Sequence, residues 1–398
     1  MKWEVKTLDD LCDIARGGSP RPIKSYLTNE PDGINWIKIG DASASSKYIY
    51  ETQEKIKPEG IKKSRFVEPG DFLLSNSMSF GRPYIMRTSG CIHDGWLVLK
   101  DKSGLFDQDY LYYFLGSQAA YKQFDKLAAG STVRNLNTTL VKKVLVPVPP
   151  IAEQKRIVEI LDESFSGIER AEAIARQNLT NARELFDSYL NKIFLDFVER
   201  KNTQTLNCIT DLIVDCEHKT APTQETGFPS IRTPNIGKGH LILDNVYRVS
   251  EETYKQWTRR AKPQSGDLIL AREAPAGNVG VIPEGERVCL GQRTVLIRPK
   301  ENINPQYLAF FLLHPKMQER LLSKSSGATV QHVNMKDIRA LKMGDLPPIE
   351  IQDRLIESLL DVQEKSKKLE EVYQRKIEAL GKLKQSILQK AFSGQLTQ

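Results

Sequence analysis

The sequence has few cysteines, and they are widely scattered. Its five cysteines include no CxxC pair. An odd, dispersed set argues against a disulfide framework or a zinc knuckle and favours a reducing cytoplasm. Cys216 and His218 could be two metal ligands, but no second pair lies near them in the sequence. A metal site is therefore the disfavoured interpretation, and we expect no metal.

Long hydrophobic runs are also missing. No stretch approaches the roughly 18 uninterrupted apolar residues of a membrane span. The first residues, Met1-Lys2-Trp3-Glu4-Val5-Lys6, lack the apolar segment of a secretory signal. We therefore expect a cytoplasmic protein with no membrane partner. The net charge of +7 is compatible with a polyanionic partner but does not require one.

Signature motifs of nucleotide binding are lacking. No Gly-Lys-Ser/Thr sequence completes a P-loop. The segment Gly237-Lys238-Gly239 is rich in glycine but has no further part of a dinucleotide-binding fingerprint, so a turn is the favoured interpretation. We predict no catalytic residues and no cofactor bound by this chain.

The most informative feature that is present is an internal duplication. The segment Pro149-Pro150-Ile151 recurs 198 residues later as Pro347-Pro348-Ile349, and the match continues without insertion to Phe194 and Phe392. Both copies carry apolar residues in two rows of seven-residue period, which is the pattern of a coiled-coil seam. The sequence predicts long helices from about 151 to 197, roughly 70 Å in length, and from about 349 to 392.

One row of the predicted seam stays in register between the two helices, where Ala175 matches Tyr373 and Ala182 matches Leu380. In the first helix the rows are Leu161, Ile168, Ala175, Ala182, Tyr189 and Leu179, Phe186, Ile193. In the second helix they are Leu355, Val362, Leu369, Leu383 and Leu359, Tyr373, Leu380, Ile387, with Ser366 and Lys376 as polar interruptions. Equivalent seams favour antiparallel packing about a pseudo-twofold axis. Such a protein suits a two-part, non-palindromic site on duplex DNA.

The rest of the chain is also duplicated, more loosely. The segment Gly70-Asp71-Phe72-Leu73-Leu74 matches Gly266-Asp267-Leu268-Ile269-Leu270. In the first copy we expect strands near 34–39, 72–74 and 97–99, a helix over 110–127 and an extended connector over 144–150. The predicted fold is α+β, with two mixed α/β domains separated by two long antiparallel coiled-coil helices and an internal pseudo-twofold repeat. The expected divisions are 1–148, 149–200, 201–346 and 347–398.

One segment superficially resembles the Asn-Pro-Pro-Tyr motif of amino-methyltransferases. It is Asn304-Pro305-Gln306-Tyr307, and its counterpart Asp107-Gln108-Asp109-Tyr110 has no such character. A helix start is the favoured interpretation, with Asn304 as N-cap and Pro305 at the first helical position.

Candidate DNA-contacting residues gather at corresponding places in the two halves while differing in identity. Their side chains carry the donor and acceptor groups that fit base edges in the major groove. They are Arg16, Ser19, Arg21, Asn76, Arg82 and Arg134 in the first half, and His218, Lys219, Arg232, Asn235, Arg272, Arg293, Gln331 and His332 in the second.

Several of these segments resemble the DNA-specificity subunit of type I restriction-modification systems. They are the two Pro-Pro-x-x-x-Gln-x-x-Ile/Leu helix starts, the Gly-Asp-x-Leu/Ile-Leu segments at 70 and 266, His218-Lys219-Thr220-Ala221-Pro222 and Ala391-Phe392-Ser393-Gly394-Gln395-Leu396. The first-half counterpart of the histidine segment, Gly18-Ser19-Pro20, lacks the histidine.

The resemblance implies two target-recognition domains that each bind half of a split DNA site, and helices that act as spacer and docking surface. It implies a non-catalytic chain whose partners are double-stranded DNA, two methyltransferase subunits and restriction motor-nuclease subunits. S-adenosylmethionine, ATP and Mg²⁺ would be bound by those subunits. Two alternatives remain at this point: a coiled-coil scaffold that binds only proteins, and a free-standing methyltransferase.

Overall fold

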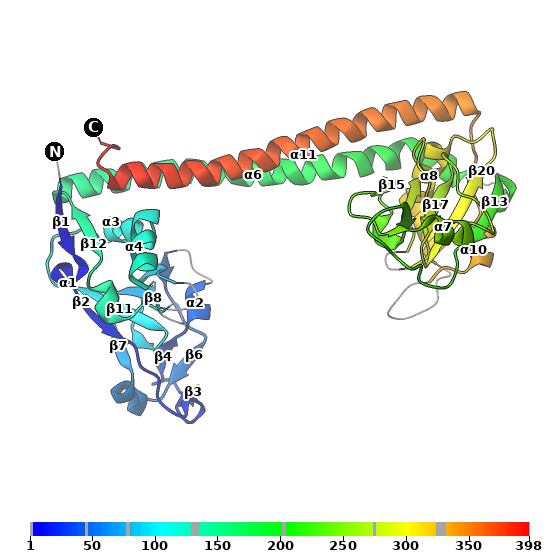
Figure 1. Cartoon of the computed structure of the whole chain (residues 1–398). Helices are drawn as coiled ribbons and strands as arrows, with labels where there is room; N and C mark the ends of the chain where they lie inside the picture. Colours follow the sequence, from blue (N-terminus) through cyan, green and yellow to red (C-terminus); the bar gives the residue numbers. More distant parts are fainter. Residues whose placement is uncertain are drawn as a thin grey trace. The chain divides into compact units, whose positions relative to one another are not determined.

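The computed structural model spans the 398 residues and describes 3–43, 47–76, 80–128, 135–200, 204–273, 276–323 and 332–397. The chain divides into two compact units. The first consists of Met1–Arg176 with Gln374–Gln398, and the second of Gln177–Tyr373. Two long helices, α6 (Ile151–Glu199) and α11 (Ile349–Phe392), each contribute one part to each unit (Figure 1). Their bounds confirm the predicted helices.

The first unit is built on two five-stranded sheets. One has the order β2-β11-β8-β9-β5 and the other the order β3-β6-β4-β10-β7. The strands of the first sheet are β2 (Cys12–Arg16), β5 (Tyr48–Ile49), β8 (Phe72–Ser75), β9 (Pro83–Met86) and β11 (Trp96–Asp101). Those of the second are β3 (Leu27–Thr28), β4 (Ile34–Ile37), β6 (Glu54–Ile56), β7 (Arg65–Val67) and β10 (Gly90–Ile92).

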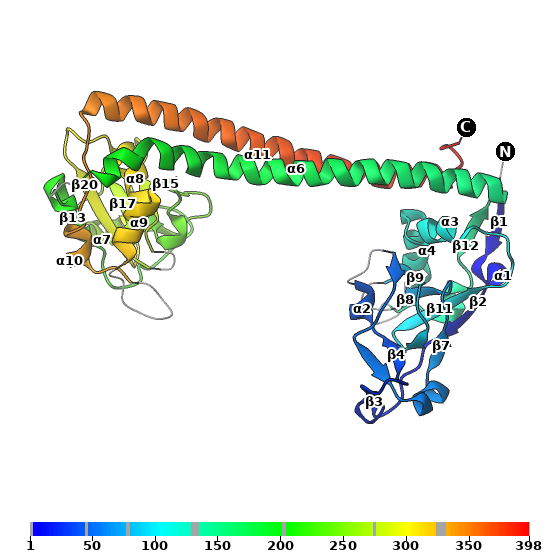
Figure 2. The same ribbon diagram turned by 180° about the vertical axis from the view of Figure 1, so that it is seen from behind.

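The predicted connector over 144–150 is partly a strand. Strand β12 (Leu145–Val148) pairs with β1 (Glu4–Thr7) in an antiparallel two-stranded sheet. Pro147 is tolerated because both strands of such a ribbon are edge strands, where a missing N–H is accommodated. Both chain ends belong to this unit (Figure 2), where Trp3 and Leu396 pack against one apolar cluster.

The second unit repeats this design. Its main sheet has the order β13-β20-β17-β18-β15, and a three-stranded sheet has the order β16-β14-β19. The strands are β13 (Thr210–Asp215), β14 (Phe228–Ile231), β15 (Gly239–His240), β16 (Arg248–Val249), β17 (Leu268–Ala271), β18 (Val279–Val281), β19 (Cys289–Leu290) and β20 (Thr294–Pro299). In both main sheets three antiparallel pairings are followed by a parallel one, β5 with β9 and β15 with β18.

The single helix expected over 110–127 is two helices, α3 (Gln108–Leu115) and α4 (Gln118–Ala128). The apolar periodicity is helical in both, but the backbone turns between them. The N–H of Gly116 closes α3 by donating to the carbonyl of Tyr112, and the Ser117 hydroxyl accepts from the Ala120 N–H at 3.3 Å. A serine that caps a new helix explains the break.

Helices at matching places complete each unit. The counterparts of α3 and α4 are α8 (Pro305–Leu313) and α9 (Pro315–Leu322), and α10 (Met335–Arg339) corresponds to α5 (Thr138–Val141). Asn304 caps α8 by accepting from the Tyr307 N–H, and Pro305 is its first residue, as predicted. The other α-helices among the described residues are α1 (Leu8–Leu11), α2 (Ile39–Ser43) and α7 (Glu251–Trp257).

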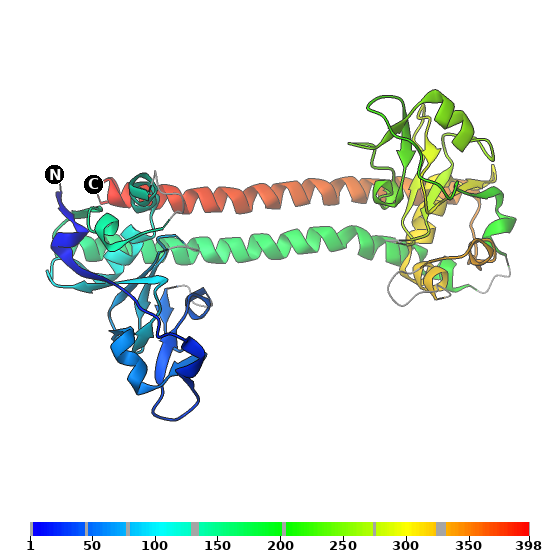
Figure 3. The same cartoon turned by 60° about the horizontal axis from the view of Figure 1, so that its bottom comes forward.

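The long helices lie side by side within each unit (Figure 3) and run antiparallel. In the first unit Lys384 contacts Glu169 at 3.5 Å, and in the second Arg183 contacts Glu370 at 3.2 Å. Buried or half-buried residues on α6 include Leu161, Ile168, Ala175, Ala182, Tyr189, Leu179, Phe186 and Ile193, which confirms both predicted rows. The hydroxyl of Ser366 donates to the carbonyl of Ala182, so this polar interruption belongs to the interface.

One predicted row of α11 is partly wrong. Leu369 and Leu383 are 39% and 47% exposed, whereas Leu359 is fully buried. The second row that packs on α6 contains Ile356, Glu370, Lys384 and Ala391 instead, at the positions equivalent to the rows of α6. The residue types misled the prediction because the row includes the charged pair members Glu370 and Lys384. Among the described helices, none is long and apolar enough to cross a membrane.

Candidate nucleic-acid interface

The candidate residues of the first unit gather around one carboxylate, Asp94, in the turn before β11. The Ser19 hydroxyl donates to Asp94 Oδ1 at 2.7 Å, and Arg21 Nη2 lies 4.0 Å from Oδ2. Arg16 Nε and Asn76 Nδ2 donate to the Asp94 carbonyl at 3.0 and 2.8 Å. We call Arg16, Ser19, Arg21, Asn76 and Asp94 the Asp94 cluster.

The charged groups of the Asp94 cluster are exposed at the edge of a surface pocket. The hydrogen bond from Ser19 holds the pKa of Asp94 below its usual value, so the carboxylate is ionised at neutral pH. The carboxylate and the Arg21 guanidinium stay accessible, with 47% and 84% of their side chains exposed. They line a surface pocket of about 750 Å³ together with Trp36 and His93. Asn76 is buried and supports the turn rather than the rim.

The second unit has a larger cluster at the matching place. Arg272 Nη1 donates to Asp215 Oδ2 at 2.6 Å, and His218 Nε2 lies 3.4 Å from the same oxygen. Arg272 Nη2 lies 2.9 Å from His332 Nε2, and His332 Nδ1 contacts Glu273. Arg293 Nε lies 2.9 Å from Glu273 Oε2. These six residues, Asp215, His218, Arg272, Glu273, Arg293 and His332, form what we call the Glu273 cluster.

The same backbone positions carry the two clusters. The Asn76 N–H donates to the Gly95 carbonyl, in the turn before β11. The Arg272 N–H donates to the Arg293 carbonyl, in the turn before the matching strand β20, so Asn76 and Arg272 are equivalent. Arg16 and Asp215 are equivalent too, since each ends its strand opposite Leu97 or Val295. The same two backbone positions therefore carry the amide Asn76 and the cation Arg16 in the first unit. In the second unit they carry the cation Arg272 and the carboxylate Asp215.

The side chains of the other predicted residues form no hydrogen bond or ion pair with these clusters in the described part of the chain, or lie outside that part. Arg82 is exposed and its guanidinium lies over the Tyr84 ring at 5.2 Å; Arg232 lies over Tyr247 at 4.1 Å. Asn235 accepts a hydrogen bond from the Arg232 N–H, and Lys219 is exposed. Arg134 and Gln331 fall outside the described residues.

Three carboxylates were missed by the sequence-based prediction: Asp94, Asp215 and Glu273. The prediction sought arginine, lysine, histidine and amide side chains, whose donor and acceptor groups fit base edges in the major groove, and it did not consider carboxylates. The duplication itself carried a usable signal for Asp94. Cys91 matches Cys289 at the helix offset of 198, so Asp94 and Gly95 match Gln292 and Arg293.

No metal site is found: the part of the chain that the structure describes holds no group of three His, Cys, Asp or Glu placed to bind an ion. Cys216 and His218 do not form a ligand pair. Burial raises the pKa of the Cys216 thiol, and His218 faces Asp215. The chemistry of both clusters is that of hydrogen-bond donors and acceptors.

Comparisons with known proteins all lead to the same family. A family model described as the type I restriction modification DNA specificity domain matches residues 1–176 and 215–379. The specificity subunit of the type I restriction enzyme EcoBI of Escherichia coli is 23% identical over 99% of this chain and 86% of its own. That of EcoKI from Escherichia coli K12 is 22% identical, with 99% and 89% covered.

Two solved structures share the fold. A chain from a type I R-M system, studied for its assembly and conformational transition, has a TM-score of 0.77 at 18% identity, covering 99% of this chain and 98% of its own. The HsdS subunit of Thermoanaerobacter tengcongensis has a TM-score of 0.64 at 18% identity, with 99% and 97% covered. Since the family model spans most of the chain, this protein belongs to the type I restriction-modification DNA specificity family.

Proposed function

We propose that this chain is the DNA-recognition subunit of a type I restriction-modification complex, in which residues 1–148 and 201–346 each recognise one half of a split DNA sequence. The observation that carries the proposal is the pair of clusters. Equivalent backbone positions on matching sheets present different sets of charged and polar side chains. Two versions of one scaffold with different side chains suit two different half-sites, because specificity comes from donor and acceptor patterns facing base edges.

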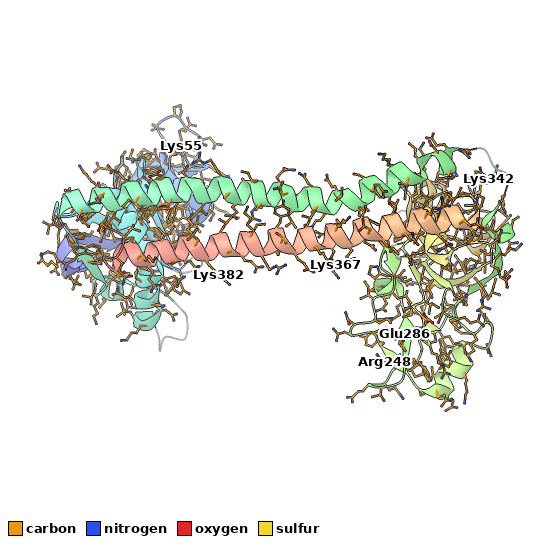
Figure 4. The ribbon with its side chains drawn as sticks, turned by 90° about the horizontal axis from the view of Figure 1, so that it is seen from above. Lys55, Arg248, Glu286, Lys342, Lys367 and Lys382 are labelled. Atoms are coloured by element: carbon orange, nitrogen blue, oxygen red, sulfur yellow. The ribbon has the colours of Figure 1, made fainter. Side chains whose placement is uncertain are left out.

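The long helices, within 149–200 and 347–398, are proposed to set the distance between the half-sites and to dock methyltransferase subunits. The exposed side of α11 supports docking. Leu369, Val372 and Leu383 are 39–50% exposed on a helix whose other face packs on α6. Lys367 and Lys382 also project outward from α11 (Figure 4). Apolar residues with charged neighbours are typical of a surface that binds another protein.

The chain is proposed to be non-catalytic. Partner subunits would supply S-adenosylmethionine-dependent adenine methylation and ATP- and Mg²⁺-dependent cleavage. The clusters fit this division of labour. Their buried members, Asn76 and Arg272, are used to hold neighbouring groups, and their exposed members are suited to hydrogen bonding.

The test is methylome mapping of the complete complex. The chain is expressed with its methyltransferase subunits in a host without other adenine methylation, and methylated adenines are located across the genome. The expected result is a motif of two fixed blocks separated by a gap of unspecified bases. Methylation without a sequence motif would contradict the proposal, and methylation by the isolated chain would contradict its non-catalytic part.

A domain exchange assigns the blocks. Replacing residues 1–148 by the corresponding region of another specificity subunit should change one block and leave the other block unchanged. A change in both blocks would show that the halves do not act as separate recognition regions. The same exchange tells which block belongs to residues 201–346.

A further inference from the structure

One of the two arginines of the Glu273 cluster, Arg293, is unusual in both its backbone and its side chain. Its φ is +66°, in the left-handed region that side-chain-bearing residues rarely adopt. The equivalent residue of the first unit, Gly95, does not have a positive φ, so the left-handed conformation at this position belongs to the second unit. Such conformations persist where the surrounding structure holds them, and they concentrate at binding sites.

A chain of side chains fixes the direction of the Arg293 guanidinium. Arg293 Nε faces Glu273 Oε2 at 2.9 Å, and the other oxygen of Glu273 contacts His332 Nδ1. His332 Nε2 lies 2.9 Å from Arg272 Nη2. Arginine can only donate, so His332 Nε2 accepts and Nδ1 carries the proton towards Glu273. The bonding pattern thereby sets the histidine tautomer.

Arg272, at the other end of this series of contacting side chains, is anchored in the core. Arg272 is 6% exposed, donates from Nε to the Val333 carbonyl at 2.9 Å, and donates from Nη1 to Asp215 at 2.6 Å. All three of its donor groups are thus engaged inside the protein. Arg272 and His332 are positioning residues, and Arg293 is the member of the chain that reaches solvent, with 57% of its side chain exposed.

The outer end of Arg293 matches one base. Within the described residues the ion pair of Arg293 uses Nε, so Nη1 and Nη2 remain available on a side chain that is 57% exposed. Two parallel N–H donors complement the O6 and N7 acceptors of guanine, the bidentate contact in the major groove. A phosphate would instead approach the Glu273 carboxylate, which repels it. The pairing with Glu273 therefore favours a neutral base edge over the DNA backbone.

We propose that Arg293 recognises a guanine in the half-site bound by residues 201–346, with Glu273, His332 and Arg272 holding its guanidinium in place. This inference rests on the proposed function and adds to it a residue and a base. It requires that the block assigned to residues 201–346 contain a G·C pair. A block made only of A·T pairs would overturn it.

The experiment compares two variants in the assembled complex. Arg293→Lys keeps the positive charge but loses the planar pair of donors. Arg293→Gly places the first unit's residue at this position and removes the left-handed strain, so folding is preserved. Each variant should relax one G·C position of that block, with discrimination against the other bases falling roughly 10- to 100-fold. The other block should not change.

A matched control is Arg259→Lys. Arg259 is exposed to a similar degree, at 64%, and it faces a largely shielded glutamate, Glu217, at 3.3 Å. The φ of Arg259 is not in the left-handed region. Replacing Arg259 should therefore leave the motif unchanged.

The outcomes separate the two proposals. If the unaltered complex methylates without a motif, the proposed function fails. If it has a motif that both Arg293 variants retain, or if they relax an A·T position, the function stands and the assignment of Arg293 is overturned. A uniform loss of affinity with an intact motif would mean that Arg293 contacts phosphate, which also overturns it.

Discussion

Gln154 and Gln352, which are 198 residues apart, make the same three hydrogen bonds. Gln154 accepts from the Asp107 N–H at 2.7 Å and donates to the Leu105 and Pro149 carbonyls at 2.9 and 2.7 Å. Gln352 accepts from the Asn304 N–H at 2.9 Å and donates to the Asn302 and Pro347 carbonyls at 3.3 and 2.8 Å. Both side chains are buried. Each glutamine ties the start of a long helix to the start of a helix, α3 or α8, in the globular region.

Replacing either glutamine by alanine should therefore loosen one unit at a time. The change leaves one part-buried N–H and two carbonyls without their hydrogen-bond partner, at a cost of about 1–3 kcal/mol. In hydrogen exchange of the full chain, Gln154→Ala should reduce protection around residues 105–112, and Gln352→Ala should do so around 302–309. Gln177→Ala is the control, because that side chain is exposed and bonds only to Asn181 in the described structure. Equal loss of protection in both units would contradict a local role.

The buried His314 predicts that acid destabilises the second unit. It lies between α8 and α9, is fully buried, and caps α9 by accepting from the Lys316 N–H. Burial, assisted by the charges of Lys316 and Arg320, holds its pKa below the ordinary value. As the pH falls through about 6.5, the unfolded chain binds a proton that the folded chain resists, so the free energy of unfolding decreases.

The variant His314→Asn isolates this contribution. Asparagine keeps an acceptor for the helix cap but does not titrate. Unfolding of the second unit, measured from pH 7.5 to 5.0, should depend less on pH in the variant. Some dependence should remain in the first unit, where burial also lowers the pKa of His93. An unchanged slope for the second unit would show that His314 does not cause it.

The Asp94 cluster predicts a defect confined to the first half-site. Asp94→Asn keeps the size of the side chain but removes the charge that faces Ser19 and Arg21. Because a carboxylate accepts from base amino groups and an amide oxygen does so less strongly, discrimination at one position should weaken by about 1–3 kcal/mol. Methylome mapping of the variant complex should show one relaxed position in the block assigned to 1–148. A relaxed position in the other block would disprove this assignment.

The corrected seam of α11 makes a stability prediction. Leu359 is fully buried, so Leu359→Ala should lower the free energy of unfolding by about 2–5 kcal/mol. Leu383→Ala, at a side chain that is 47% exposed, should change it by less than about 0.5 kcal/mol in the isolated chain. Urea unfolding measures both. A large cost at Leu383 would restore the row predicted from the sequence.

The duplication made most of the fold predictable. It gave the two long helices, the rows of α6 and the helix start at Asn304, because proline pairs, heptads and caps are local signals. The break between α3 and α4 was missed since helical periodicity continues across Gly116 and Ser117. The wrong row on α11 has a similar cause. Leucine marks a seam only on average, and Leu369 and Leu383 lie on the outer face.

The sites were only partly predictable. Ser19 and Arg16 were found because they cluster in the sequence, but their common partner Asp94 lies 75 and 78 residues further along the chain. Buried and exposed arginines also look alike in a sequence. Arg272 and Arg293 have the same side chain, yet the strand ends direct one into the core and the other to solvent. Such distinctions depend on tertiary packing.

The antiparallel helices predict how the DNA gap responds to length. Removing seven residues from α6 and the seven opposite them from α11 keeps the seam rows nearly in phase, because seven residues make close to two turns. At 1.5 Å per residue the loss is about 10 Å, or roughly three base pairs at 3.4 Å each. The motif should keep both blocks while the gap shortens by about that number. Removing five residues from each helix instead rotates the seam out of phase, so this control should abolish assembly. An unchanged gap after the seven-residue deletion would show that these helices do not determine the spacing of the half-sites.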